Sequence, residues 1–339
     1  MNGLLKRLNI DAYILLLATM VALASVLPAR GIGATIAGIC ANIGIVLLFF
    51  MHGARLSRQA VIDGVRHWRL HAAVAAMTYL LFPVLGIAIW TLPFIDPSLA
   101  TGILFLTLLP STVQSSIAFT AMAKGNVAGA VCSASFSNLA GIFITPLLAA
   151  LLITGKHGGF STDAVTTIAG QLLLPFLTGH LLRPWIGAWI TRQKKLLTIV
   201  DRGSILLVVY TAFSAAVVAG LWSKVSMADL GEIAALSGAL LAVVLVVSDF
   251  VGKRLGFNRE DRIVLQFCGS KKSLASGVPM AGVLFSASQV GAIILPLMFF
   301  HQIQLMICAL LARRYAERLD QQQATGGICQ KDVAAARAG

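Results

Sequence analysis

The chain has 339 residues, of which 58% are hydrophobic and only 12% are charged, and its mean hydropathy is +0.87. A soluble domain carries about 25% charged residues because its surface faces water, so this composition excludes an ordinary soluble protein and predicts a surface in contact with a lipid bilayer. The net charge of +13 does not indicate nucleic-acid binding, because the basic residues form short clusters between long apolar runs.

Ten apolar stretches follow one another along the chain, each near the roughly 20 residues that a spanning helix needs. We expect helices at residues 11–27, 33–51, 70–91, 98–123, 126–154, 164–184, 203–222, 229–253, 260–285 and 288–312. Lys6 and Arg7 precede the first stretch and imitate a signal peptide, but the ten-span count requires this segment, so we expect it to stay as the first span. The five cysteines show no CxxC spacing and indicate neither a disulfide framework nor a zinc site.

Basic residues in the predicted loops divide unequally between the two sides of the membrane. One side collects Lys124 and the clusters within residues 6–7, 55–69, 183–202, 253–262 and 313–337, whereas the other side has only Arg30, Lys156 and Lys224. Cytoplasmic loops carry an excess of Lys and Arg. Both termini are therefore expected in the cytoplasm, with the protein in a bacterial inner (plasma) membrane.

The ten spans divide into two groups of five, residues 11–154 and 164–313, joined by a linker at 155–163. An odd number of spans in each half forces the halves into opposite orientations, which is the inverted-repeat architecture of many transporters. The predicted fold is thus an all-α membrane protein of ten transmembrane helices in two inverted five-helix repeats. Residues 1–10 form a cytoplasmic N-terminus, and residues 314–339 form a polar cytoplasmic tail that we expect to be disordered.

The fourth predicted helix contains a proline followed by a dense polar run near the middle of the membrane. Its polar residues are Thr107, Ser111, Thr112, Gln114, Ser115 and Ser116, around Pro110. Proline removes a backbone hydrogen bond, and small polar side chains then satisfy the freed carbonyls or a ligand. Hydroxyls that bond back to their own helix are the alternative. The density of polar residues favours a site, with Thr112, Gln114, Ser115 and Ser116 as substrate-binding candidates.

The ninth predicted helix places two adjacent lysines, Lys271 and Lys272, near the centre of the bilayer. A lysine there costs about 2.5–3.5 kcal/mol, so such residues usually mark function. The alternative is a buried pair with Asp249, or with the C-terminal carbonyls of a half-helix. Adjacent helix positions point about 100° apart, so one lysine can be structural while the other faces a cavity. Ser270 and Ser273 join the substrate-binding candidates, and Gln266 is a cavity-lining candidate.

The two motifs fall at corresponding places in the two halves. Gln114, Ser115 and Ser116 are followed by Ile and Ala in the fourth helix, and Lys271, Lys272 and Ser273 are followed by Leu and Ala in the ninth. A five-residue match is weak by itself, but its position supports the division into repeats.

Other polar residues within the spans have two readings of equal weight. His301, Gln302 and Gln304 in the tenth predicted helix either line the same cavity or form hydrogen bonds between helices. Asn138 and Gln171 have the same two alternatives. Asp249 is expected to pair with Lys253 at the i,i+4 spacing near a helix end.

The sequence lacks the motifs of common enzymes. HExxH, GxSxG and the P-loop are absent, and Gly31 and Gly33 lie between two predicted spans without the βαβ context of a dinucleotide site. The six histidines are scattered without metal-ligand spacing. We therefore expect a protein that is not an enzyme and that holds no metal or cofactor.

The two polar helices resemble those of the bile acid:sodium symporter superfamily, and most closely its outlying branch with the seventh vertebrate member and its bacterial relatives. The resemblance covers roughly residues 10–312 and is most specific at 47–57 (LLFFMHGARLS), 110–116 (PSTVQSS), 124–126 (KGN) and 268–279 (CGSKKSLASGVP). It implies ten helices in a panel and a core domain. It also implies that the fourth and ninth helices are discontinuous and cross at the binding site.

The chain departs from the sodium-binding members of that family at the positions that the resemblance assigns to sodium. The Ser-Asn pair of those members is Ser115-Ser116 here, and their third-helix glutamine falls at Thr78. The remaining ligand positions correspond to Ala130, Ala134, Phe267, Lys271 and Lys272. The resemblance implies a sodium-coupled carrier of organic anions, whereas these residues argue against sodium coupling.

These observations together predict an alternating-access secondary transporter for a small organic anion. Lys271 or Lys272 would supply the counter-charge, and the serines and Gln114 would supply hydrogen bonds. Thr78, Asn138, Phe267, His301 and Gln302 are expected to line the cavity together with Gln266. The alternatives are a non-transporting regulatory membrane protein on the same fold and a membrane-embedded enzyme. The sequence leaves the substrate, the coupling ion, the stoichiometry and the oligomeric state open.

Overall fold

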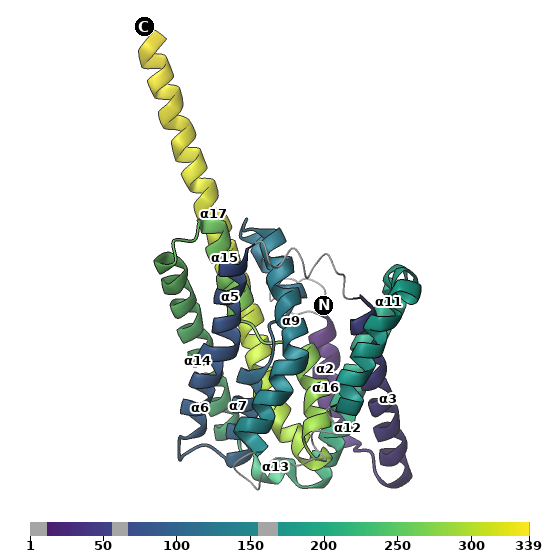
Figure 1. Ribbon diagram of the computed structural model, residues 1–339. Helices are drawn as coiled ribbons and strands as arrows, with labels where there is room; N and C mark the ends of the chain where they lie inside the picture. The colour runs from purple at the N-terminus through teal and green to yellow at the C-terminus, as the bar shows by residue number, and fades with distance from the viewer. Residues whose placement is uncertain (1–11, 56–66, 155–168, 339) are drawn as a thin grey trace.

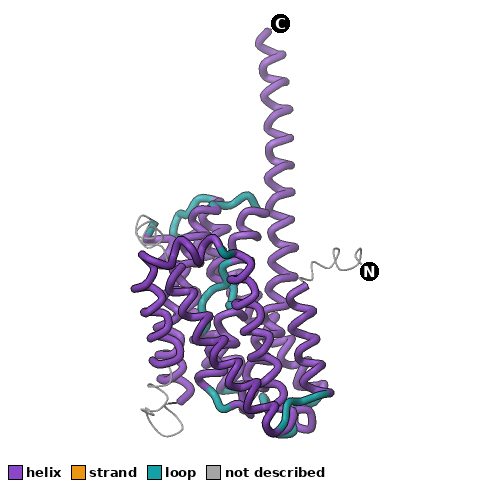
Figure 2. Tube along the Cα trace, turned by 90° about the vertical axis from the view of Figure 1, so that its right-hand side faces the viewer, coloured by secondary structure: helices purple, strands orange, loops and turns teal. Residues whose placement is uncertain are grey.

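A computed structural model describes residues 12–55, 67–154 and 169–338. All secondary structure in these ranges is helical, in agreement with the predicted all-α class (Figure 2). The first half contains α2 (Ala12–Val26), α3 (Gly31–Arg55), α5 (Trp68–Ala76), the π-helical turn η1 (Met77–Leu81), α6 (Phe82–Trp90), α7 (Pro97–Leu108), α8 (Gln114–Met122), α9 (Val127–Ala149) and the π-helical turn η2 (Ala150–Thr154).

The second half begins within the described residues at a third π-helical turn. It contains η3 (Ala169–Leu173), α11 (Leu174–Arg192), α12 (Lys194–Val218), α13 (Leu221–Lys224), α14 (Met227–Arg254), α15 (Arg259–Gly269), α16 (Leu274–Leu284) and α17 (Ala287–Ala338). The N-terminal segment 1–10, the linker 155–163 and the basic residues Arg58, Arg66 and Lys156 all lie outside the described ranges.

Six helical stretches of the described chain are long and apolar enough to cross a membrane. They are Gly31–Ala54, Trp68–Trp90, Val127–Ile153, Lys195–Val218, Met227–Arg254 and Ala287–Leu319. Large apolar side chains such as Ile32, Leu80, Val246 and Leu310 lie exposed on these stretches, as expected for helices that meet lipid. The helices at the predicted first, fourth, sixth and ninth spans are not among these six, and the count of ten spans stays a prediction.

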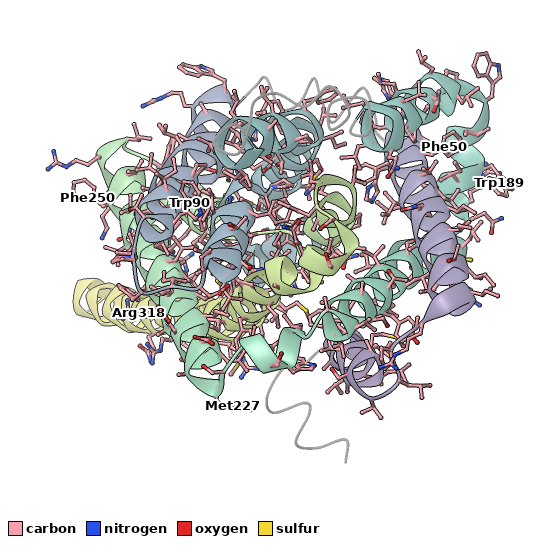
Figure 3. The ribbon with its side chains drawn as sticks, turned by 90° about the horizontal axis from the view of Figure 1, so that it is seen from below. Phe50, Trp90, Trp189, Met227, Phe250 and Arg318 are labelled. Carbon is pink, nitrogen blue, oxygen red and sulfur yellow. The ribbon has the colours of Figure 1, made fainter. Side chains whose placement is uncertain are left out.

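The helices pack in two groups that share α12. On one side α3 packs along α11 and α12, and α12 packs along α2. On the other side α17 packs against α7 and α14, and α5 and α8 pack against α9. Figure 3 places Phe50 of α3 and Trp189 of α11 at one edge of the molecule and Phe250 of α14 at the opposite edge. Contacts of α12 with α16 and α17 join the two groups.

Two glycines explain the close packing of α3 and α11. A Cβ atom at Gly53 would lie 1.9 Å from the carbonyl oxygen of Phe176, and one at Gly179 would lie 2.0 Å from that of Phe50. Both distances are too short for any side chain. The helix backbones therefore touch directly, as small residues allow between membrane helices.

The C-terminal part of α17 leaves the helix bundle and continues to Ala338 (Figures 1 and 2). The sequence predicts disorder after Asp320, whereas the structure gives this segment a helical backbone. Its alanines, glutamines, lysine and arginine are good helix formers, whereas Gly326 and Gly327 are poor ones.

Candidate functional site at two helix breaks

The first helix break separates α7, which ends at Leu108, from α8, which begins at Gln114. Pro110 stands in the break and has no backbone N–H. The carbonyls near the end of α7 therefore lack their usual helical donors, and in a membrane protein each needs another donor. The structure shows where these donors come from.

Each carbonyl from residue 106 to residue 111 accepts a hydrogen bond. Leu109 N donates to Leu106 O at 3.3 Å, and Thr145 Oγ1 of α9 donates to Leu108 O at 2.8 Å. Asn138 Nδ2, also of α9, donates to Ser111 O at 2.6 Å. The donors for the other three carbonyls come from the second break, at residues 270–273. They are Lys272 Nζ for Thr107 and Leu109, and Ser273 N for Pro110.

The second helix break separates α15, which ends at Gly269, from α16, which begins at Leu274. Ser273 caps α16 by accepting a hydrogen bond from Ser276 N at 3.2 Å, a typical N-cap role for serine. Gln304 of α17 forms two hydrogen bonds with the backbone of this break. Its Oε1 accepts from Lys272 N at 2.9 Å, and its Nε2 donates to Lys272 O at 3.0 Å.

The Lys272 ammonium is fully buried and donates hydrogen bonds to three backbone carbonyls. They belong to Thr78 at 2.9 Å, Thr107 at 2.7 Å and Leu109 at 2.8 Å. The ammonium also lies 4.1 Å from the centre of the Phe82 ring. An ammonium has three N–H donors, and all three are satisfied here.

Thr78 O is free to accept from Lys272 because of the local sequence. In the π-helical turn η1, Phe82 N donates to the carbonyl of Met77. In an α-helix, Phe82 N would donate to Thr78 O instead. The next residue that could donate is Pro83, which has no N–H. A proline thus frees a carbonyl in the third predicted span, as Pro110 does in the first break.

The Lys271 ammonium is also fully buried, but its surroundings are different. It donates one hydrogen bond, to Ser115 O at 3.0 Å, and it lies 3.7 Å from the centre of the Phe119 ring and 5.3 Å from that of Phe267. Aromatic ring faces attract cations weakly compared with oxygen atoms. The Ser115 Oγ atom is buried and has no hydrogen-bond partner, so this part of the site has unused polar capacity.

Besides the hydrogen bonds of the two lysine ammonium groups, two others join the interrupted segments. Ser273 N donates to Pro110 O at 2.9 Å, and Ser116 Oγ donates to Phe267 O at 3.0 Å. Ser276 Oγ adds a third link by donating to Asn138 Oδ1 at 2.9 Å. The breaks therefore form one polar centre inside an apolar bundle.

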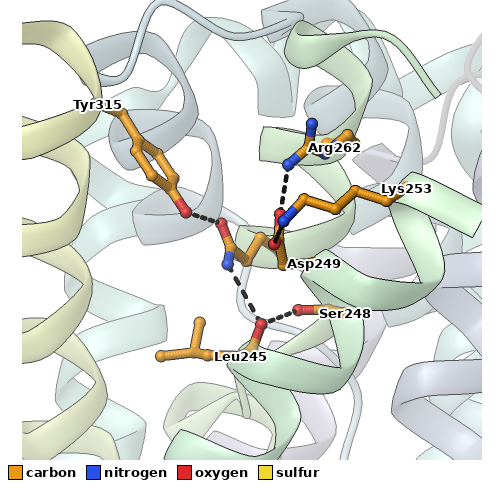
Figure 4. Close-up of polar contacts among 7 residues, drawn as sticks. Leu245, Ser248, Asp249, Lys253, Arg262 and Tyr315 are labelled. Atoms are coloured by element: carbon orange, nitrogen blue, oxygen red, sulfur yellow. Dashed lines mark hydrogen bonds and ion pairs between the residues drawn. The ribbon is translucent and has the colours of Figure 1, made fainter. Parts of the chain in front are cut away.

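A second polar group lies farther along α14, α15 and α17 (Figure 4). Tyr315 donates to Gln266 Oε1 at 2.6 Å, and Gln266 Nε2 donates to Leu245 O at 3.2 Å. Asp249 forms ion pairs with Lys253 at 2.5 Å and with Arg262 at 2.6 Å. The predicted Asp249–Lys253 pair is thus confirmed, and Asp249 pairs with neither of the two deep lysines.

A family model describing the SBF-like CPA transporter family matches residues 11–317. The chain belongs to this family. The putative symporter YfeH of Escherichia coli is 55% identical over 317 residues, which cover 93% of this chain and 96% of that protein. Sodium/bile acid cotransporter 7-A of Xenopus laevis is 27% identical over 91% of this chain and 92% of that protein.

An uncharacterized protein of Pseudomonas aeruginosa is 56% identical over 91% of this chain and 94% of its own length. As an SBF-like family member, the chain is an integral membrane protein of the bile acid:sodium symporter type, and its family consists of transporters and not enzymes. The resemblance inferred from the two polar helices is confirmed.

The structure brings most of the candidate residues of this SBF-like protein to the polar centre. Nine of them lie at or beside the two breaks: Thr78, Ser115, Ser116, Asn138, Phe267, Ser270, Lys271, Lys272 and Ser273. Gln114 is exposed at the start of α8, and Thr112 is half-buried within the first break. Gln266 belongs instead to the group around Tyr315. Gln171 faces a groove of about 600 Å³ between α3 and α11, away from the lysines.

His301 and Gln302 have different surroundings although they are neighbours on α17. His301 Nδ1 lies 2.9 Å from Gln304 Nε2, so it supports the residue that holds Lys272. Gln302 Oε1 is buried without a hydrogen-bond partner. The sequence did not single out Thr145, Ser276 or the rings of Phe82 and Phe119, because apolar and hydroxyl residues at helical spacing are common in any membrane span.

Three of the positions that the family resemblance assigns to sodium carry buried apolar side chains. Ala130 and Ala134 are fully buried in a cluster with Val264, Leu265 and Cys268. Phe267 is fully buried against the rings of Phe119 and Tyr315. Sodium is a hard cation that needs oxygen ligands, and these side chains offer none. Ala130, Ala134 and Phe267 therefore supply no side-chain oxygen for sodium, whereas Thr78, Ser115 and Ser116 carry hydroxyl groups.

Proposed function

We propose that this protein is a secondary transporter that carries a small organic anion by alternating access, with the anion bound where the two helix breaks meet. The observation that carries the proposal is the Lys271 ammonium, which is fully buried and donates only one hydrogen bond. In the described part of the chain, neither Lys271 nor Lys272 forms an ion pair with a carboxylate. A buried charge needs a partner of opposite sign, which a bound anion supplies.

The N-terminus of α8 adds to the attraction for an anion. Val113 at its N-cap provides no side-chain hydrogen bond, and the first N–H groups of a helix have no intrahelical acceptors. They present a partial positive charge to a ligand. Gln114 is exposed at this end and Ser115 Oγ is unpartnered, so we assign hydrogen bonds to the anion to these two side chains, supported by Ser116, Ser270 and Ser273.

We also propose that the chain forms ten spans in two inverted repeats, with α7–α8 and α15–α16 as the discontinuous fourth and ninth spans. The hydrogen bonds between the breaks support this pairing. Ser116 follows Pro110 by the same number of residues as Ser273 follows Phe267. The bonds from Ser116 Oγ to Phe267 O and from Ser273 N to Pro110 O therefore join corresponding residue pairs of the two halves, with a hydroxyl as donor in one and a backbone N–H in the other.

Transport is proposed to be independent of sodium. The buried Phe267 ring and the apolar cluster around Ala130 and Ala134 support this, and so does the charge of Lys271. At about 4 Å, two unit positive charges repel by roughly 4 kcal/mol with an effective dielectric constant near 20. A sodium ion beside this ammonium would bind about a thousandfold more weakly.

The proposed setting is the inner membrane of a bacterium, with both termini in the cytoplasm. Fusion of a compartment-sensitive reporter after residue 320 and within residues 55–69 should report cytoplasm. A fusion near residues 156–160 should report the exterior. If the first two reporters lie on opposite sides of the membrane, the ten-span topology is wrong.

Flux in liposomes tests the function. The purified full-length protein is reconstituted, and uptake is measured for labelled small carboxylates, sulfate esters and phosphate esters that raise its thermal stability. We expect saturable uptake of at least one anion, and the Lys271→Met protein should lose it while still inserting. Binding without flux in the wild type would instead identify a non-transporting regulatory protein on the same fold.

A further inference from the structure

The three carbonyls around the Lys272 ammonium have the features of a cation site. Thr78, Thr107 and Leu109 direct their oxygens at one point from 2.7 to 2.9 Å. Rings of backbone carbonyls replace the hydration shell of potassium ions in the same manner. The three oxygens come from two separate segments, η1 and the end of α7, so the point is defined by tertiary packing and not by one turn.

Two further features favour a positive charge at this point. Thr107 and Leu109 lie at the C-terminal end of α7, where the helix dipole presents partial negative charge. The Phe82 ring faces the ammonium at 4.1 Å, and an aromatic face attracts cations by its quadrupole. We refer to the three carbonyls and the Phe82 ring as the cation cage.

We propose that the cation cage is a binding site for a monovalent cation, and that the chain itself supplies this cation as the ammonium group of Lys272. The tethered ammonium holds η1 to the end of α7 and keeps the polar centre positively charged in any external salt. When the side chain is removed, the cage should accept a free primary ammonium ion. The proposal does not depend on which solute the protein carries.

Lys271 provides an internal control because it is the neighbouring residue and equally buried. Its ammonium has one carbonyl partner, Ser115 O, and two aromatic rings. One oxygen does not form a cage, so removal of the Lys271 side chain should not create a site for a free cation.

The test is chemical rescue of the purified full-length Lys272→Ala protein, followed by thermal unfolding in choline chloride at fixed ionic strength. We expect the melting temperature to fall by about 5 °C or more, and to recover by at least about 3 °C when ammonium or methylammonium replaces choline. Methylammonium reproduces the tip of the lysine, with three N–H donors on one carbon. Tetramethylammonium has the same charge but no N–H donor and should have no effect.

Two companion variants keep the result decisive. Lys272→Met fills the space without the charge, so it should be destabilised and should not respond to ammonium ions. Lys271→Ala should not respond either. The proposal is overturned if Lys272→Ala shows no gain specific to primary ammonium ions, if Lys271→Ala or Lys272→Met gains equally, or if Lys272→Ala is recovered folded in none of these salts.

Discussion

The first half supplies only neutral donors to the carbonyls around its own break at residues 109–113, whereas the break at 270–273 contributes two ammonium groups. Thr145 and Asn138 of α9 satisfy carbonyls of the first break, and Gln304 of α17 holds the backbone of the second. The charges of the second break do not serve that break. They reach across to carbonyls of the first half, those of Ser115, Thr107, Leu109 and Thr78.

This difference shows how two related motifs acquire different tasks. Each break leaves carbonyls that need donors, and an amide on the following helix meets part of the need in both halves. The lysines occur in the second half only, so only that half contributes positive charge to the polar centre. Lys272 uses all its donors on the protein, whereas Lys271 keeps capacity for a ligand.

Exchange of the two lysines for methionine should give the largest effects and separate their roles. Lys271→Met should lower the affinity for the transported anion by tenfold or more, about 1.4 kcal/mol, with little change in melting temperature. Lys272→Met should mainly lower the melting temperature, because three buried carbonyls lose their donor. Ligand titration and thermal unfolding of both proteins measure these effects. Misassembly of both would make both charges structural, and unchanged anion binding in both would remove the lysines from the mechanism.

Loss of the two amides should have an intermediate effect of similar size in each break. Asn138→Leu leaves Ser111 O without its short hydrogen bond, and Gln304→Leu leaves both backbone polar groups of Lys272 unpaired. An unpaired buried group costs about 1–3 kcal/mol, which corresponds to a fall of several degrees in melting temperature. Gln302→Leu is the matched control on α17, since its buried Oε1 has no partner to lose. A larger loss in the control would contradict this comparison.

Thr145→Val should have a smaller effect, confined to the first break. The change removes the donor to Leu108 O at nearly constant volume, so we expect a loss of about 1 kcal/mol in stability. Thr101→Val is the control, because Thr101 is on α7 but its hydroxyl bonds back to Pro97 O at an exposed position. Thermal unfolding should show a lower melting temperature for Thr145→Val only. Equal melting temperatures would mean that water replaces the Thr145 hydroxyl.

Replacement of sodium by potassium or choline at fixed pH should have no specific effect on wild-type stability or uptake. Five of the positions that the family resemblance assigns to sodium carry alanine, phenylalanine or lysine here, and the second break already holds two positive charges. A saturable gain with sodium in either measurement would restore the usual family mechanism and would mean that the alignment of the ninth predicted helix is shifted.

The sequence alone determined the all-helical membrane character and the family, and it located the two polar segments around Pro110 and Lys271. These features follow from local signals. The apolar composition indicates a lipid environment, and Pro110 and the glycine and serines around Lys271 indicate interruptions of the helices. Two lysines in an apolar run are too costly to occur without a reason. The same signals placed Asn138 and Gln304 among the candidates, without choosing between a ligand and a structural role for them.

Only the tertiary structure decided which lysine has which surroundings. Lys271 and Lys272 are adjacent and chemically identical, so no local rule assigns one to three carbonyls and the other to one carbonyl and two rings. That assignment depends on carbonyls left free before Pro83 and at the end of α7, in distant parts of the chain, and on how η1 and α7 pack together. The partners of a buried charge are set by long-range packing, because the donors and acceptors that meet it come from different helices.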